Sequence, residues 1–99
     1  MKITQFEGKN GGVKNQFLIT EVGNGANGNF IKRETFQSYD SIIAIKTYWT
    51  DKIEIELDET YWNYSTTTGK YRNLFLGENK QATEKKIKSG EYILTNLNK

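Results

Sequence analysis

Histidine and cysteine, the residues that most often carry acid–base, nucleophilic and zinc chemistry, are both absent from this 99-residue sequence. Histidine is the side chain whose ordinary pKa suits proton transfer near neutrality, and it is the commonest metal ligand. Catalytic systems that pair serine or cysteine with histidine are therefore excluded, as are the usual zinc sites. We predict a non-enzymatic protein that binds a macromolecule and has no catalytic residue, metal or other cofactor. An enzyme that uses only carboxylates is the alternative.

Acidic residues are concentrated in the middle of the chain, where residues 40–59 hold six acids against two lysines. Glu54, Glu56 and Asp58 alternate with apolar residues, so a strand here would carry all three on one face. Such a face could compete for a basic groove on a nucleic-acid enzyme. The alternative is a solvated face that protects the strand from aggregation. Alternate carboxylates on a flat strand do not converge on one metal ion.

The C-terminal part of the chain is basic, because residues 60–99 hold seven basic residues against three acids. Cations interleaved with aromatic rings are typical of single-stranded nucleic-acid binding, since bases stack on rings while cations follow the backbone. The alternative is a soluble lysine-rich helix with the aromatic rings in the core. The residues predicted to form a nucleic-acid-binding surface are Tyr64, Lys70, Tyr71, Arg72, Lys85, Lys86 and Lys88.

The elements that position these residues are mostly strands. The isoleucine-rich segment 41–48 and the strict alternation in 53–57 predict an antiparallel hairpin, with Ile53, Ile55 and Leu57 facing inward. A glycine-containing turn and a loop rich in glycine and asparagine separate the other strands. The turn is predicted at 9–12 and the loop at 23–29; the weaker strand patterns lie at 1–7, 13–22, 30–36 and 91–97.

Two short helices are predicted after the hairpin. Hydroxyl residues at 65–68 can cap a helix that carries Tyr71, Leu74 and Phe75 at helical spacing and ends at Gly77. The same segment is not a Walker A motif, because Tyr71 follows the lysine where that motif requires serine or threonine.

The second helix is predicted over residues 80–88, capped by Asn79 and anchored by Ala82 and Ile87. The chain has no repeat and no linker. We therefore predict a single α+β domain over residues 1–99. It consists of a small antiparallel sheet, with a central hairpin at about 41–57, and two short helices near the C-terminus.

The arrangement Phe36-x-Ser38-Tyr39-Asp40-x-x-Ile43-Ala44, followed by a hairpin and then Tyr64-Ser65-x-Thr67-Thr68-x-Lys70, resembles a family of small uncharacterised domains. The resemblance covers about Phe36–Tyr92. These domains are common in phages and mobile elements of low-GC Gram-positive bacteria. Members often have histidine after the lysine, where this chain has Tyr71. The family has no assigned activity, so the resemblance implies a setting in which small proteins disarm defence nucleases or manage viral DNA.

These observations lead to two hypotheses for function. The first is a phage-type accessory protein in the host cytoplasm that blocks a defence nuclease through Glu54, Glu56 and Asp58, as anti-CRISPR proteins do. The second is a single-stranded DNA-binding protein that uses the basic surface. The absence of cysteine favours a reducing cytoplasm, and no apolar run is long enough to span a bilayer. An exposed edge strand at 91–97 would favour a homodimer.

Overall fold

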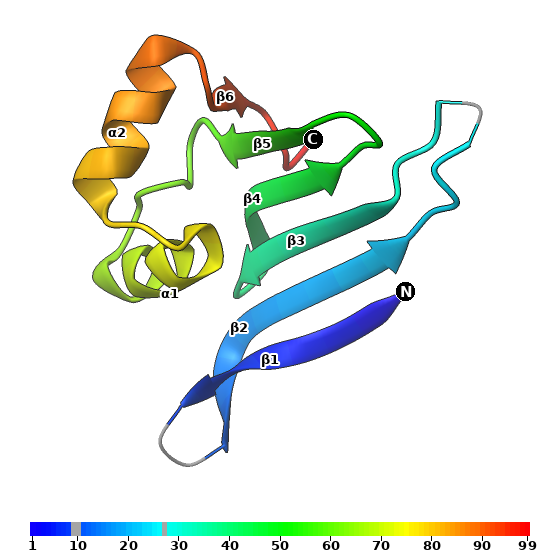
Figure 1. Cartoon of the computed structure of the whole chain (residues 1–99). Helices are drawn as coiled ribbons and strands as arrows, with labels where there is room; N and C mark the ends of the chain where they lie inside the picture. The colour runs from blue at the N-terminus through cyan, green and yellow to red at the C-terminus, as the bar shows by residue number, and fades with distance from the viewer. Residues whose placement is uncertain (9–10, 27) are drawn as a thin grey trace.

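The computed structural model describes residues 1–8, 11–26 and 28–99, which form six strands and two helices (Figure 1). The two helices follow β5 in the C-terminal half, so the predicted α+β fold is confirmed. No helix in the described ranges combines the length and apolarity needed to cross a membrane. The elements are β1 (Lys2–Gly8), β2 (Gly11–Val22), β3 (Lys32–Ser38), β4 (Ser41–Tyr48), β5 (Ile53–Asp58), α1 (Thr66–Leu76), α2 (Lys80–Ser89) and β6 (Ile93–Thr95). The predicted turn at 9–12 lies partly outside the described residues.

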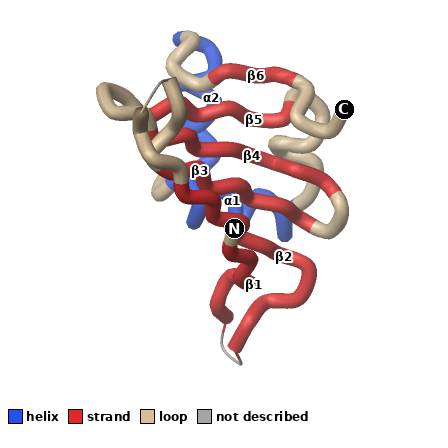
Figure 2. The backbone as a smooth tube through the Cα atoms, turned by 90° about the vertical axis from the view of Figure 1, so that its right-hand side faces the viewer, coloured by secondary structure: helices blue, strands red, loops and turns tan. Residues whose placement is uncertain are grey.

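The strands form one sheet whose spatial order is the order of the sequence (Figure 2). Strands β1 to β5 pair with their neighbours antiparallel. The predicted hairpin is confirmed, with Ala44 opposite Leu57 and Tyr48 opposite Ile53. The expected edge strand is present but short, and it runs parallel to β5. The parallel direction requires a crossover, and the chain makes it through α1 and α2 before it returns beside Glu56 and pairs with the last three residues of β5.

Both helices lie on one face of the sheet, and in the described part of the chain no helix covers the other face (Figures 1 and 2). Phe36, Ala44 and Leu57 lie opposite one another in register on three neighbouring strands, so their side chains share one face of the sheet. This is the face that carries the helices, because all three residues belong to the same core cluster as residues of α1. Tyr71 and Phe75 of α1 pack against these strand residues. The core therefore lies between α1 and the centre of the sheet.

Two apolar residues that the sequence predicts to face inward are exposed instead. Leu74 is 59% exposed, because the buried stripe of α1 consists of Thr68, Tyr71, Arg72 and Phe75, and Leu74 falls outside it. Ile53 is 60% exposed because it begins β5, at the end of the hairpin away from the core. Helical and strand periodicity predict which residues share a face, but the extent of the covering layer decides which of them are buried.

Gln16 is a polar residue without exposed surface, opposite Ser38 in register. Neither atom of its amide has a hydrogen-bond partner among the described residues, and such an unpaired buried group costs about 1–3 kcal/mol. We expect Gln16→Met, which preserves side-chain length, to raise the free energy of unfolding by about 1–2 kcal/mol. Chemical denaturation measures the change. Gln5→Met at an exposed position of β1 is the control, and equal effects of the two substitutions would contradict the prediction.

Candidate functional site

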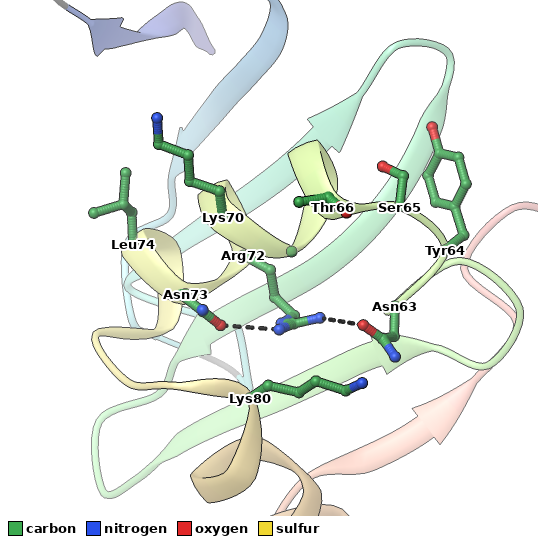
Figure 3. Close-up of a pocket in the computed structure, with 10 residues that line it drawn as sticks. Asn63, Tyr64, Ser65, Thr66, Lys70, Arg72, Asn73, Leu74 and Lys80 are labelled. Atoms are coloured by element: carbon green, nitrogen blue, oxygen red, sulfur yellow. Dashed lines mark hydrogen bonds between the residues drawn. The ribbon is translucent and has the colours of Figure 1, made fainter.

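An open pocket of about 790 Å³ lies where α1, the segment before it and the start of α2 meet (Figure 3). Its lining contains three cations, and none of the described lining residues is a carboxylate. Several amide and hydroxyl groups complete the polar surface of the pocket. The polar and charged lining residues include Asn63, Tyr64, Ser65, Lys70, Arg72 and Lys80.

The N-terminus of α1 is held in place by hydroxyl groups. Ser65 is the N-cap, and its Oγ accepts a hydrogen bond of 3.1 Å from the backbone N–H of Thr68. The Oγ1 of Thr68 is buried and lies 2.9 Å from Oγ of Ser38, at the end of β3. These contacts confirm the predicted cap and also join the helix to the sheet. The pocket is therefore built on a fixed helix end.

Arg72 is the central residue of the pocket and is only 1% exposed. Its Nη1 donates to the backbone oxygen of Trp62 at 3.0 Å and to Oδ1 of Asn63 at 3.1 Å. Its Nη2 donates to Oδ1 of Asn73 at 2.9 Å. A guanidinium has five N–H donors, so the Nε–H and one Nη2 hydrogen remain without a partner among the described residues.

The positive charge of Arg72 is not neutralised by direct contact with a carboxylate. All three of its acceptors are neutral, and no salt bridge within the described residues includes it. Burial lowers the pKa of Arg72, and the more distant Glu84 and Glu78 raise it in part. The guanidinium also lies over the ring of Trp62, 5.3 Å from its centroid. A buried charge with incomplete compensation favours an anionic ligand.

Lys80 extends beside Arg72 toward Asn63, whereas Lys70 stands at the rim and points away from the guanidinium (Figure 3). Lys80 is the first residue of α2, and neither helix has an acidic residue in its first turn. The macrodipole makes a helix N-terminus positive, so a lysine there adds to a field that acidic residues normally balance. The exposed pair of Lys80 with Glu84, at 3.9 Å, offsets little of this charge.

Tyr64 is 46% exposed on another side of the pocket (Figure 3). Its ring packs edge-on against Tyr61, with the centroids 5.6 Å apart and the planes at 82°. This contact restricts the ring while leaving surface for a second aromatic group. Three of the predicted nucleic-acid-binding residues, namely Tyr64, Lys70 and Arg72, therefore lie at one pocket.

Tyr71 does not lie on this surface, so its predicted role in stacking on a base is wrong. The residue is buried, and its ring centroid lies 5.6 Å from that of Phe6. Phe6 in turn packs edge-on against Phe36, with the centroids 5.3 Å apart. Tyr71 is thus part of the core, as the alternative interpretation of the aromatic residues expects.

Lys86 is bound within the protein instead of facing a ligand. Its Nζ lies 2.7 Å from Oε1 of Glu78, which also accepts from the hydroxyl of Tyr92 at 2.8 Å. Oε2 of Glu78 accepts from Thr83 at 2.7 Å. Burial alone would raise the pKa of Glu78, but the hydrogen bonds from Lys86, Thr83 and Tyr92 outweigh it and lower the pKa. This cluster fixes α2 to the chain before β6.

Lys85 and Lys88 are exposed on α2, outside the lining of the Arg72 pocket. The lysine-rich helix predicted from the sequence therefore divides into three parts. Lys80 enters the pocket, Lys86 is paired with Glu78, and Lys85 and Lys88 face solvent.

Of the three residues predicted to form an exposed acidic face, Glu54, Glu56 and Asp58, Asp58 is only 1% exposed and does not contribute to the surface. Its Oδ2 accepts from the backbone N–H groups of Thr60 at 3.0 Å and Tyr61 at 2.8 Å. Its Oδ1 accepts from the backbone N–H of Leu97 at 2.8 Å. Burial alone would raise the pKa of Asp58, but the hydrogen bonds, from Leu97 and Tyr61 first, hold it below the ordinary value. The prediction of an exposed Asp58 is wrong, since the carboxylate ends β5 and fastens the C-terminal segment.

Glu54 and Glu56 do share the face without helices, as predicted. Glu54 lies opposite Thr47, and Glu56 lies between Ile45 and Ile93 in register. Both glutamates are half-buried by their neighbours. Nowhere in the described ranges do three possible acidic ligands gather around a metal position.

The predicted set of binding residues did not include four residues that hold Arg72 or lie beside it in the pocket, namely Trp62, Asn63, Asn73 and Lys80. Lys80 could have been recognised from the sequence, because it directly follows the N-cap asparagine. A lysine at that position lies at the positive end of the helix dipole, which is electrostatically unfavourable. Nothing in the sequence indicates the other three. They contribute a backbone oxygen and two amide oxygens to Arg72 from either side of the α1 start.

The fold and the pocket define an α+β protein in which two helices cover one face of a mostly antiparallel sheet and border a cationic pocket. Residues 1–91 match a family described as Family of unknown function (DUF8033), and the chain belongs to this family. The comparisons with curated proteins and with solved structures gave no match.

Proposed function

We propose that this protein binds single-stranded DNA at the pocket between α1 and α2. The observation that carries the proposal is Arg72, a buried guanidinium that has only neutral acceptors, and two N–H groups without a partner, among the described residues. A phosphate oxygen seated in the pocket would supply the negative charge that the described residues do not place against Arg72. Lys80 and the two helix starts contribute positive potential at the same place.

The residues around the rim of the pocket can contact more than one nucleotide of a bound strand. Tyr64 exposes an aromatic ring on which a base can stack, a contact worth about 1–3 kcal/mol. Lys70 stands on another side and can follow the phosphate backbone (Figure 3). Bases of a duplex are already stacked in pairs, so this arrangement favours a single strand over a duplex.

A fluorescence-anisotropy titration with single- and double-stranded oligonucleotides tests this proposal. Three engaged cations predict a slope of about −2 for log affinity against log salt, because each phosphate contact on a single strand contributes about −0.7. Raising the salt fourfold should therefore weaken single-strand binding roughly 20-fold. Duplex binding is expected to be weaker at each salt concentration. Absence of binding at low salt, or affinity that does not change with salt, would rule the proposal out.

Inhibition of a defence nuclease in a host cytoplasm is a second proposal, supported by the sheet face without helices. The register joins six residues of this face in one row across the sheet: Ile3, Ile19, Thr35, Ile45, Glu56 and Ile93. Exposed isoleucines at both ends of the row, with Glu54 and Glu56 near one end, offer apolar and acidic groups to a protein partner. Glu54→Lys combined with Glu56→Lys should then abolish inhibition of DNA cleavage by a CRISPR effector nuclease. Unchanged inhibition would exclude this face.

A further inference from the structure

The guanidinium of Arg72 is held in one orientation, and two of its N–H groups have no partner in the part of the chain that the structure describes. Trp62, Asn63 and Asn73 hold the guanidinium from two sides through three hydrogen bonds of 2.9 to 3.1 Å. Nearly all of the side chain is covered by protein. A donor that is ordered before the ligand arrives loses little entropy on binding, so it can discriminate between ligands by charge and shape.

The positive charge around Arg72 and Lys80 is larger than the single negative charge of one internal phosphate. Arg72 and Lys80 both line the pocket (Figure 3), and the N-terminus of α2 adds a partial positive charge. An internal phosphodiester carries one negative charge, whereas a terminal phosphate carries about −1.5 to −2 at neutral pH. A terminal phosphate also has one more oxygen free of ester bonds to accept hydrogen bonds.

Access to Arg72 also differs between the two kinds of phosphate. The guanidinium is buried, while Lys70 stands at the rim, where a continuous strand can pass (Figure 3). An internal phosphate must bring a nucleotide on each side past the pocket walls. A terminal phosphate has only one attached nucleotide, so it can approach a buried donor more closely.

We propose that Arg72 and Lys80 form a subsite for the terminal phosphate of a single DNA strand. This inference rests on the proposed function and adds a specificity for strand ends to it. Lys80 is the charged partner that reaches the phosphate beside Arg72. Lys70 contacts the internal backbone and does not distinguish one end group from another.

The test compares three oligonucleotides of one sequence, each with an internal fluorophore, that carry a 5′-phosphate, a 3′-phosphate or hydroxyl groups at both ends. We expect one phosphorylated form to bind about tenfold or more tightly than the hydroxyl form, as for one added charge-assisted hydrogen bond. The 5′ and 3′ forms show which end the subsite accepts. Inorganic phosphate should weaken binding of the preferred form more than binding of the hydroxyl-ended form.

Two matched substitutions locate the preference. Lys80→Gln should remove the difference between phosphorylated and hydroxyl ends, while Lys70→Gln should weaken all forms alike and keep the difference. Both lysines are exposed, so thermal unfolding is expected to show intact folds. Equal affinity of the three oligonucleotides, or a preference that survives Lys80→Gln, would overturn the subsite while leaving DNA binding in place. Absence of binding to all three would overturn the proposed function as well.

Discussion

Replacement of Asp58 by alanine is expected to lower the free energy of unfolding by about 3 kcal/mol. The substitution leaves the backbone N–H groups of Thr60, Tyr61 and Leu97 without their buried acceptor. Each hydrogen bond to a charged group contributes about 1.5–3 kcal/mol, and partial rehydration of the exposed turn reduces the sum. The loss is large for a protein of this size, whose total stability is of the order of 5–15 kcal/mol.

Chemical denaturation at neutral pH measures this effect. Asp51→Ala provides the matched control, because Asp51 is an exposed aspartate in the turn between β4 and β5. We expect that control to change the free energy of unfolding by less than about 0.5 kcal/mol. If both variants unfold at the same denaturant concentration, Asp58 does not fasten the C-terminal segment.

The same carboxylate should make the protein sensitive to acid. The pKa values of Asp58 and Glu78 lie below their ordinary values in the folded state, because hydrogen bonds outweigh the effect of burial. The stability contributed by these groups is therefore complete above the unfolded pKa values of about 4 and is lost as the pH falls through the lower folded values. Asp58→Asn should flatten the decline in stability below about pH 4.

Reversal of charge at Lys70 and Lys80 is expected to weaken single-stranded DNA binding by about 100-fold or more, which corresponds to about 2.8 kcal/mol. The Lys70→Glu, Lys80→Glu variant places two carboxylates beside the phosphate path proposed for the pocket (Figure 3). A glutamate at position 80 also suits the start of α2, so the fold should be retained. The measurement is anisotropy at low salt.

The control for this variant is Lys85→Glu with Lys88→Glu, which lowers the formal net charge of +2 by the same four units. These lysines lie on α2 outside the pocket lining. The control should bind within about fivefold of the unaltered protein, since only the long-range field changes. Equal losses in the two variants would mean that net charge, and not the pocket, governs DNA binding.

Much of the fold could be predicted because short-range patterns and the final packing agree. Alternation in 53–57 predicts β5, and Ser65 and Gly77 predict both ends of α1. The parallel pairing of β6 could not be predicted. It depends on where two helices return the chain, and three residues of β6 carry too little pattern to show direction.

The site was harder to predict, because two charged residues are buried by contacts between distant segments. Arg72 and Asp58 are charged, so the sequence alone indicates exposure for both. Arg72 is buried because Trp62 and Asn63, which precede the helix, supply acceptors that no local pattern reveals. Asp58 is buried because the returning C-terminal segment donates the N–H of Leu97.

The parallel contact between β5 and β6 has a consequence for the order in which the chain can fold. Strands β1 to β5 pair only with neighbours in sequence, so each pairing closes a short loop. The last pairing must close a loop that contains residues 59–92, with both helices inside it. Closing a long loop costs conformational entropy before the new contacts stabilise the chain. We therefore expect the β5–β6 pairing to form more slowly than the antiparallel pairings of β1 to β5. The pocket also needs both helices, so a chain emerging from the ribosome can pair β1 to β5 before it completes its binding site.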